Sequence, residues 1–281
     1  VLEDSIITSA SSNRYSFSVY QGSIFRMSNS ELHYCGWEGG SSGLDIHSGD
    51  AVIENNLMSH NFNNVFVHSS GVIIRNNNIT ASFQGIAIGG PLSISPTIYN
   101  NHISWNTYGI NFGGCSPSIY NNTITSNQGT GIYFANATPD IRNNFITNNG
   151  GQGISFSSSS ATIFNNTITS NLGIGGIDSY DYDTSTISEN IITSNLMHGI
   201  YCHENSNAII RNNTIRGNGN GIGCENSNPT IQNNNISQNN NAGISVMGLC
   251  SPIIYNNTII SNGWAGIHPN SGANPKIESN T

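Results

Sequence analysis

Apolar and polar residues follow one repeating pattern along most of this 281-residue chain. The unit is an apolar residue, a variable position, two Asn residues, another variable position and a second apolar residue, followed by an Asn and a Gly–Ile–x–apolar segment. Ten steps cover 224 residues (277 minus 53), a mean of 22.4 residues per step. The first apolar position of the unit is occupied by Ile53, Ile74, Ile98, Ile119, Ile141, Ile163, Ile187, Ile210, Ile231, Ile254 and Ile277.

Within each unit the apolar residues alternate with polar ones, as in Gly109–Ile110–Asn111–Phe112. Alternation is the period of a β-strand, whereas an amphipathic helix needs apolar residues three and four positions apart. A short repeat built from such strands predicts a solenoid. We therefore predict an all-β fold, a single-stranded right-handed parallel β-helix of about 12–13 coils of roughly 22 residues. Residues 1–281 are expected to form one domain, with degenerate coils over 1–50 and regular coils over 51–281.

The two Asn positions of the unit differ in how strictly they are kept. The second is Asn in every unit from Asn56 to Asn280, whereas the first becomes Glu189 and Ser279 in two of them. The stricter position is expected to face inward, where amides hydrogen-bond from coil to coil and satisfy buried polar groups. Further inside, the pattern predicts Ile columns and an aromatic stack formed by Phe112, Phe134 and Phe156.

Composition narrows the choice of partners and of compartment. Charged residues make up only 8% of the chain and the formal net charge is −8. Seven Lys plus Arg are too few to neutralise a phosphate backbone, so no nucleic-acid partner is predicted. No apolar run approaches the length of a membrane span, so no membrane insertion is predicted. The chain begins at Val1 and stops inside a repeat, and we expect a fragment of a larger extracellular or cell-surface protein.

The five Cys residues lie far apart in the sequence, without the CxxC spacing of a zinc site. Cys202 and Cys224 fall in one predicted column and are expected to be buried thiols. No metal site and no cofactor are predicted. His47 and His68 offer only two ligands, which leaves a divalent cation open without indicating one.

The Asn–Asn–x–Ile and Gly–Ile–x–apolar motifs resemble the parallel β-helix repeats of pectinases, sugar-hydrolase and carbohydrate-binding domains, and uronate C5-epimerases. They also resemble surface proteins of methanogenic archaea. Residues 28–36 (SNSELHYCG) and 43–47 (GLDIH) are most similar to the disaggregatase-related proteins of those organisms. This resemblance implies a domain that degrades an acidic cell-surface heteropolysaccharide, with the polysaccharide as its partner. Its oligomeric state stays open.

The predicted catalytic centre lies in the N-terminal coils. Asp45 and His47 point to one outward face, and His68 is expected directly above His47 on the next coil. Asp45 and His47 match the Asp and His of the Gly–apolar–Asp–Pro–His segment of C5-epimerases, with Ile46 in place of Pro. Glu38 is a candidate second carboxylate, and Trp37, Phe66 and His60 are expected to bind sugar. We expect a hydrolase with a carboxylate acid; a lyase, for which His would be the base, is the less favoured chemistry.

A second outward patch consists of Asp178, Tyr180, Tyr201, His203 and Glu225, next to an acidic bend with Asp181 and Asp183. We interpret it as a substrate-binding subsite; a cation site is an open alternative, and a solubilising loop over 178–183 is the plainer one.

A non-catalytic function also stays open. Another outward face carries alternating aromatic and Arg residues, which suit a long acidic glycan. Its members are Arg75, Tyr99, Tyr120, Arg142, Phe164, Arg211 and Tyr255. The alternative to an enzyme is therefore a glycan-binding or structural surface module.

Overall fold

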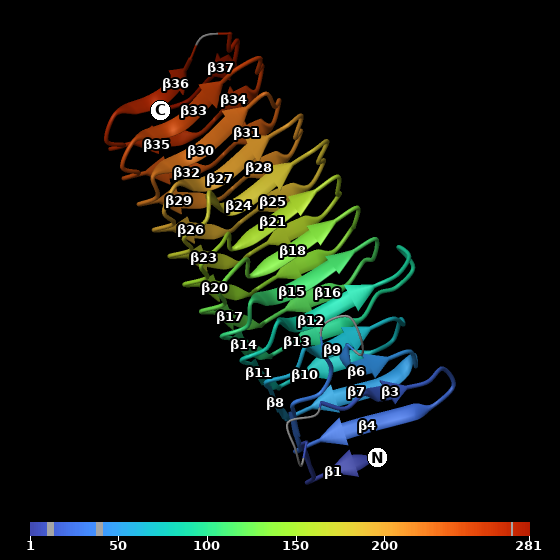
Figure 1. Ribbon diagram of the computed structural model, residues 1–281. Coiled ribbons are helices and arrows are strands. Elements are labelled where there is room, and N and C mark those ends of the chain that lie inside the picture. Colours follow the sequence, from blue (N-terminus) through green and yellow to red (C-terminus); the bar gives the residue numbers. More distant parts are fainter. Residues whose placement is uncertain (10–13, 38–41, 271) are drawn as a thin grey trace.

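The structure is a computed structural model that describes residues 1–9, 14–37, 42–270 and 272–281. In these ranges the chain forms 37 short strands and no α-helix, and the strands wind into a parallel β-solenoid (Figure 1). The two termini lie at opposite ends of the stack of coils (Figure 1). The predicted all-β parallel coil fold is confirmed. The described residues contain no helix of the length and apolarity needed to cross a membrane.

Each coil contributes one strand to each of three parallel sheets. The first sheet contains β1 (Leu2–Glu3), β4 (Ile24–Ser28), β7 (Asp50–Glu54), β10 (Ile73–Arg75), β13 (Thr97–Tyr99), β16 (Ser118–Tyr120), β19 (Asp140–Arg142), β22 (Thr162–Phe164), β25 (Thr186–Ser188), β28 (Ile209–Arg211), β31 (Thr230–Gln232), β34 (Ile253–Tyr255) and β37 (Lys276–Glu278). The second sheet contains β2 (Ile6–Ile7), β5 (Glu31–His33), β8 (Leu57–Ser59), β11 (Asn78–Thr80), β14 (His102–Ser104), β17 (Thr123–Thr125), β20 (Phe145–Thr147), β23 (Thr167–Thr169), β26 (Ile191–Thr193), β29 (Thr214–Arg216), β32 (Asn235–Ser237) and β35 (Thr258–Ile260). The third sheet contains β3 (Phe17–Val19), β6 (Gly43–Ile46), β9 (Asn63–Val67), β12 (Gln84–Gly89), β15 (Tyr108–Gly113), β18 (Ile132–Ala135), β21 (Ile154–Ser157), β24 (Gly175–Tyr180), β27 (His198–His203), β30 (Asn220–Glu225), β33 (Ala242–Met247) and β36 (Ala265–Pro269).

The register of the first sheet follows the sequence repeat. Leu2 pairs with Met27, Met27 with Ile53, and each Ile of the repeat pairs with the next as far as Ile277. The two irregular N-terminal coils therefore continue the same column. Because side chains alternate across a strand, this register places the Ile side chains from Ile53 to Ile254 in the core, whereas Ile277 in the last strand is exposed.

The strict Asn column forms the predicted ladder in the bend between the first two sheets. Nδ2 of Asn122 donates to Oδ1 of Asn144 at 3.0 Å, and Asn144 donates to Asn166 in the same way at 3.0 Å. The preceding position has a left-handed backbone, with φ of 56° at Asn143 and 58° at Glu189. Asn tolerates this conformation better than most residues. The Asn pair is thus one αL residue that turns the chain and one buried amide that joins the coils.

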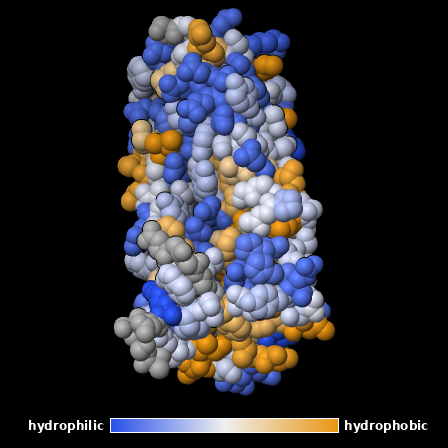
Figure 2. All heavy atoms as spheres, turned by 45° about the vertical axis from the view of Figure 1, so that its right-hand side comes forward, coloured by the Kyte–Doolittle hydropathy of each residue, from blue (hydrophilic) through white to orange (hydrophobic). Residues whose placement is uncertain are grey.

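The core contains the other predicted columns. The rings of Phe112 and Phe134 stack with centroids 5.0 Å apart, and those of Phe134 and Phe156 at 4.8 Å. Cys202 pairs in register with Cys224, and both thiols are free and buried. Outside, hydrophilic or neutral residues cover most of the face shown in Figure 2, with hydrophobic side chains scattered among them.

Candidate functional site in a groove on the third sheet

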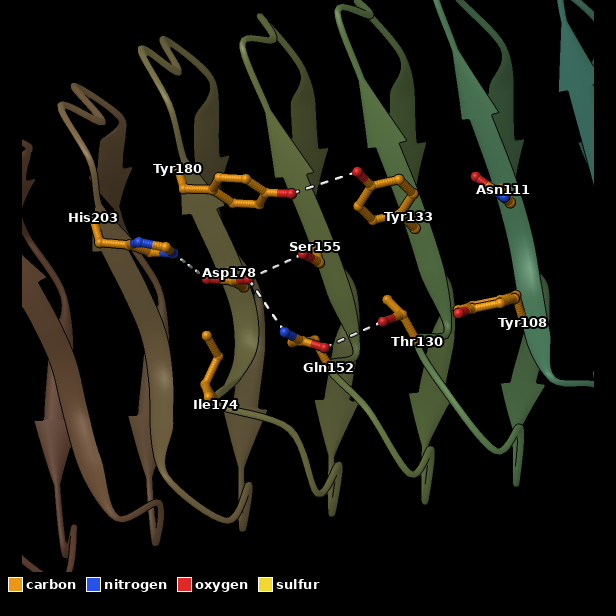
Figure 3. A pocket seen from close by; sticks show the side chains of 10 residues that line it. All are labelled: Tyr108, Asn111, Thr130, Tyr133, Gln152, Ser155, Ile174, Asp178, Tyr180 and His203. Carbon is orange, nitrogen blue, oxygen red and sulfur yellow. Dashed lines mark hydrogen bonds and ion pairs between the residues drawn. The ribbon is translucent and has the colours of Figure 1, made fainter.

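A groove of about 440 Å³ crosses the outer face of the third sheet from β15 to β27. Figure 3 shows its side chains, which come from five successive coils. It is lined by Tyr108, Asn111, Thr130, Tyr133, Gln152, Ser155, Ile174, Asp178, Tyr180 and His203. Three tyrosines give it aromatic walls, and neutral amides and hydroxyls supply most of its polar groups. Such a mixture suits a sugar, which has apolar ring faces and many hydroxyls.

Asp178 lies at the floor of the groove and its side chain is only 4% exposed. Its Oδ1 lies 3.1 Å from Nε2 of His203, and its Oδ2 accepts hydrogen bonds from Ser155 Oγ at 3.0 Å and Gln152 Nε2 at 3.3 Å (Figure 3). A buried carboxylate needs such partners, because leaving it unpaired is costly. With both oxygens engaged, Asp178 orients its neighbours; it is not free to attack a substrate.

His203 lies between two aromatic rings. Its ring stacks on Tyr180 with centroids 5.2 Å apart and on Tyr201 at 4.6 Å. Burial lowers the pKa of His203, but the hydrogen bond and charge of Asp178, assisted by Glu204 and Glu225, outweigh it and raise the pKa above 6.5. The Asp178–His203 pair is therefore a dyad in which the carboxylate stabilises the protonated imidazole.

Tyr180 supplies a second titratable group. Its hydroxyl lies 3.5 Å from the hydroxyl of Tyr133, two coils away (Figure 3). Burial and the hydrogen bond with Tyr133 raise the pKa of Tyr180 to about 12. The phenol therefore keeps its proton at neutral pH and can donate it. The groove thus combines a group that can accept a proton with one that can give one.

Two further polar residues adjoin the dyad: Tyr201 lies on β27 with His203, and Glu225 lies on β30 of the next coil. Glu225 pairs in register with His203, and the Tyr201 hydroxyl donates to its carboxylate. His198, which the sequence analysis did not single out, stacks on Tyr201 at 4.6 Å. Burial lowers the pKa of His198 to about 4, so this imidazole is neutral. A Cβ at Gly223 would lie 2.5 Å from His198 Nδ1, so only Gly leaves room for this packing.

The residues predicted for the N-terminal centre meet in part. Nε2 of His47 lies 3.2 Å from Oδ2 of Asp45, and Nε2 of His68 lies 2.9 Å from Oδ1. The two imidazoles stack at 4.4 Å with an angle of 1° between their planes, and Phe66 packs on His68 at 4.0 Å. Burial lowers the pKa of His68, with Asp45 opposing the shift. No observation tests the catalytic role of this cluster, which stays a prediction.

Trp37 and His60 line a separate groove of about 370 Å³ with Arg14, Tyr34 and Phe83. The His60 ring stacks on Tyr34 with centroids 5.4 Å apart. This groove and the Asp45 cluster have no lining residue in common. Glu38, the predicted second carboxylate, lies outside the described residues.

The two clusters repeat one arrangement six coils apart. Asp45 and Asp178 occupy one outward column of the third sheet. Each Asp contacts a His that comes from the next coil, two residues beyond the position paired with that Asp. His47 of the first cluster occupies the place that Tyr180 has in the second. The residues around the two clusters differ. Tyrosines line the groove that holds the Asp178 pair, whereas the small residues Ala87 and Gly89 lie on β12, the strand after β9 of the Asp45 cluster.

The alternative of a solubilising loop over 178–183 is wrong. Asp178 is buried, and Asp183 is fully buried with hydrogen bonds from Ser179 and Ser185 at 2.8 and 2.6 Å. Burial raises the pKa of Asp183. The small polar residues that solvate these carboxylates look unremarkable in the sequence. The sequence analysis missed Tyr108, Tyr133 and Gln152 for a related reason. They line the groove only because the register brings five coils together.

Comparisons with known proteins agree with this architecture. The family model "Right handed beta helix region" matches residues 42–184 and 173–281. No curated protein matches the chain. Among solved structures, the chain is similar to the periplasmic alginate epimerase AlgG, with 16% identity, a TM-score of 0.66 and coverage of 95% of this chain and 76% of that one.

Two further structures are similar at the level of the fold. The A-module of the mannuronan C-5 epimerase AlgE6 from Azotobacter vinelandii has 13% identity and a TM-score of 0.63, covering 95% of this chain and 90% of that one. The Dettilon tailspike protein has 16% identity and a TM-score of 0.68, covering 90% of this chain and 60% of that one.

Proposed function

This chain belongs to the right-handed β-helix family, and from that premise we propose that it binds a polysaccharide in the groove of the third sheet and cleaves it there. The observation that carries the proposal is the Asp178–His203 dyad, 3.1 Å apart, inside a groove with three tyrosines. The similar structures named as alginate and mannuronan epimerases support a uronic-acid polymer as the substrate class. Such a partner supports a location outside the cytoplasm.

The groove favours β-elimination over hydrolysis. Hydrolysis uses two carboxyl groups that flank the glycosidic bond. Asp178 is the one carboxylate among the described residues that line the groove, and it is buried and hydrogen-bonded through both oxygens. Elimination needs a base and an acid instead, and the dyad and Tyr180 provide both. This chemistry replaces the hydrolase expected from the sequence as the leading proposal.

In the proposed reaction, His203 removes the proton at C5 of a uronic-acid residue while Nε2–H points to Asp178, which leaves Nδ1 as the base. The bond from C4 to its glycosidic oxygen breaks, a C4–C5 double bond forms, and Tyr180 protonates the leaving oxygen. The neutral donors of Asn111 and Tyr133 bind the sugar carboxylate. The deprotonated Tyr180 recovers its proton from His203 through solvent, and no other reactant is consumed.

The pH dependence of cleavage is expected to report on His203. Because the base must be unprotonated, kcat/KM rises through the pKa of this residue, above 6.5. Asp178→Asn removes the carboxylate that raises this pKa and leaves the burial that lowers it. The acidic limb of the kcat/KM profile therefore moves to lower pH. Glu204→Gln, at an exposed side chain, is the matched control and gives a smaller shift in the same direction. An unmoved limb in Asp178→Asn would exclude His203 as the base.

A glycan-binding face on the first sheet is the second candidate function. Tyr99 and Tyr120 stack with centroids 5.0 Å apart, and Arg142 lies 5.0 Å over the Tyr120 ring. Arg75 donates to the Tyr99 hydroxyl at 2.9 Å and continues the same column. Rings and guanidinium groups in one outward row suit an acidic sugar chain.

Tyr120→Ala is expected to weaken the binding of an acidic polysaccharide about three- to tenfold, because one stacking surface is lost. Tyr20→Ala, at an exposed tyrosine outside this column, should bind as the wild type does. Isothermal titration with a defined uronic-acid oligosaccharide measures both. Equal affinities for wild type and Tyr120→Ala would remove the first sheet from the binding surface.

A further inference from the structure

The Asp45 cluster has the composition of a transition-metal site. Asp45 and His47 belong to the coil of β6, and His68 to the next coil, just after β9. One oxygen or ring nitrogen of each residue lies within 4.8 Å of the others. Two imidazoles and one carboxylate are the ligands that Zn²⁺ and its neighbours in the first transition row prefer.

The separations between these atoms fit a bound ion. Bonds of about 2.0 Å in a tetrahedral site place the ligand atoms roughly 3.3 Å apart. The observed separations are 3.2 Å between His47 Nε2 and Asp45 Oδ2, and 2.9 Å between His68 Nε2 and the other oxygen, Asp45 Oδ1. With one ligand atom taken from each residue, all three atoms lie within 4.8 Å of one another. The shorter contact lacks hydrogen-bond geometry, and Asp45 Oδ1 is a buried oxygen with no hydrogen-bond partner among the described residues. A buried oxygen of this kind needs a partner, which a bound cation would supply.

The surroundings bury two of the three ligand side chains more deeply than the third. The backbone N–H of His68 donates to Ile46 O at 2.9 Å, and Phe66 packs on the His68 ring. Phe66 lies over Gly89, where a Cβ would come within 3.1 Å of the ring. The side chains of Asp45 and His68 are 21% and 29% exposed, whereas that of His47 is 41% exposed.

From these contacts we propose that Asp45, His47 and His68 bind one divalent transition-metal ion, Zn²⁺ being the probe of choice. The ion joins two coils at the irregular N-terminal end of the solenoid, and its fourth position is open to water. Nitrogen ligands set the selectivity, since Mg²⁺ prefers oxygen ligands. The site shares no residue with the groove, so it does not depend on the proposed cleavage.

Zn²⁺ titration of the full chain, stripped of metal with a chelator, tests this site by calorimetry. The wild type is expected to bind one equivalent and to gain thermal stability, because the ion binds only the folded chain. His68→Ala should lose both effects. Asp45→Asn, which keeps the size of the side chain, should weaken binding at least tenfold. His102→Ala, at an exposed imidazole on β14, is the matched control and should bind as the wild type does.

Circular dichroism is the control that shows whether each variant keeps its β-structure. If His68→Ala fails to fold, Asp45→Asn still decides whether the site binds Zn²⁺. The proposal is overturned if the wild type binds no Zn²⁺, if His68→Ala and Asp45→Asn bind as tightly as the wild type, or if Mg²⁺ competes equally. Loss of binding only in a His203 variant would also overturn it, by placing the ion in the groove.

Discussion

His203→Gln is expected to lower kcat/KM for polysaccharide cleavage by about 10²- to 10⁴-fold, the contribution of one positioned acid–base group. Gln fills a similar volume and can still donate to Asp178, but it cannot accept the C5 proton. Since His203 lies between Tyr180 and Tyr201, the substitution keeps the walls of the groove largely intact. The initial rate of double-bond formation, followed by ultraviolet absorbance, measures the effect.

Two variants make this result specific. Tyr180→Phe keeps the ring that packs on His203 and removes only the proton donor, so kcat should fall while KM changes little. His268→Gln changes an outward imidazole on β36, beyond the groove, and should leave cleavage unchanged. If His203→Gln stays within threefold of the wild type, the dyad is not the catalytic base.

Asn144→Ala is expected to lower the free energy of unfolding by about 2–6 kcal/mol, since at least two buried groups lose partners worth about 1–3 kcal/mol each. Oδ1 of Asn144 accepts from both the backbone N and Nδ2 of Asn122, at 3.0 Å each. Its Nδ2 donates to Ile119 O and to Asn166 Oδ1, also at 3.0 Å each. Truncation leaves these groups buried without partners in the middle of the ladder. Denaturant unfolding measures the change.

The neighbouring residue supplies the matched control. Asn143 is exposed and has a φ of 56°, a backbone conformation that Gly adopts at little cost. Asn143→Gly should therefore change the free energy of unfolding by about 0.5 kcal/mol or less. Equal losses from Asn143→Gly and Asn144→Ala would contradict the division of the Asn pair into a turning residue and a joining residue.

Much of the fold can be predicted from the sequence, because the repeat shows which residues of successive coils lie side by side. The unbroken Asn column predicts the ladder, and the spacing of Phe112, Phe134 and Phe156 predicts their stack; both are found. The same register predicts that His68 lies on His47, which the ring distance of 4.4 Å confirms.

The sequence analysis put the catalytic centre at the Asp45 pair and only a binding subsite at the Asp178 pair. Yet each pair has an Asp in one outward column and a His on the next coil, so the strand pattern by itself does not distinguish them. The groove depends on Tyr108 and Tyr133, which lie three and two coils before Asp178 and line one groove with it only when the coils are stacked. Burial of Asp178 depends likewise on Ser155 and Gln152, whose residue types attract no attention in a Ser- and Asn-rich chain.

The most direct test of the central claim is a cleavage assay on a panel of uronic-acid polysaccharides, with reducing ends and ultraviolet absorbance recorded together for wild type and His203→Gln. The account predicts that the wild type cleaves at least one polymer and forms one new double bond, seen as ultraviolet absorbance, for each new reducing end. His203→Gln is predicted to form neither. Reducing ends without absorbance would contradict elimination and indicate hydrolysis. Neither product from any polymer would contradict cleavage altogether.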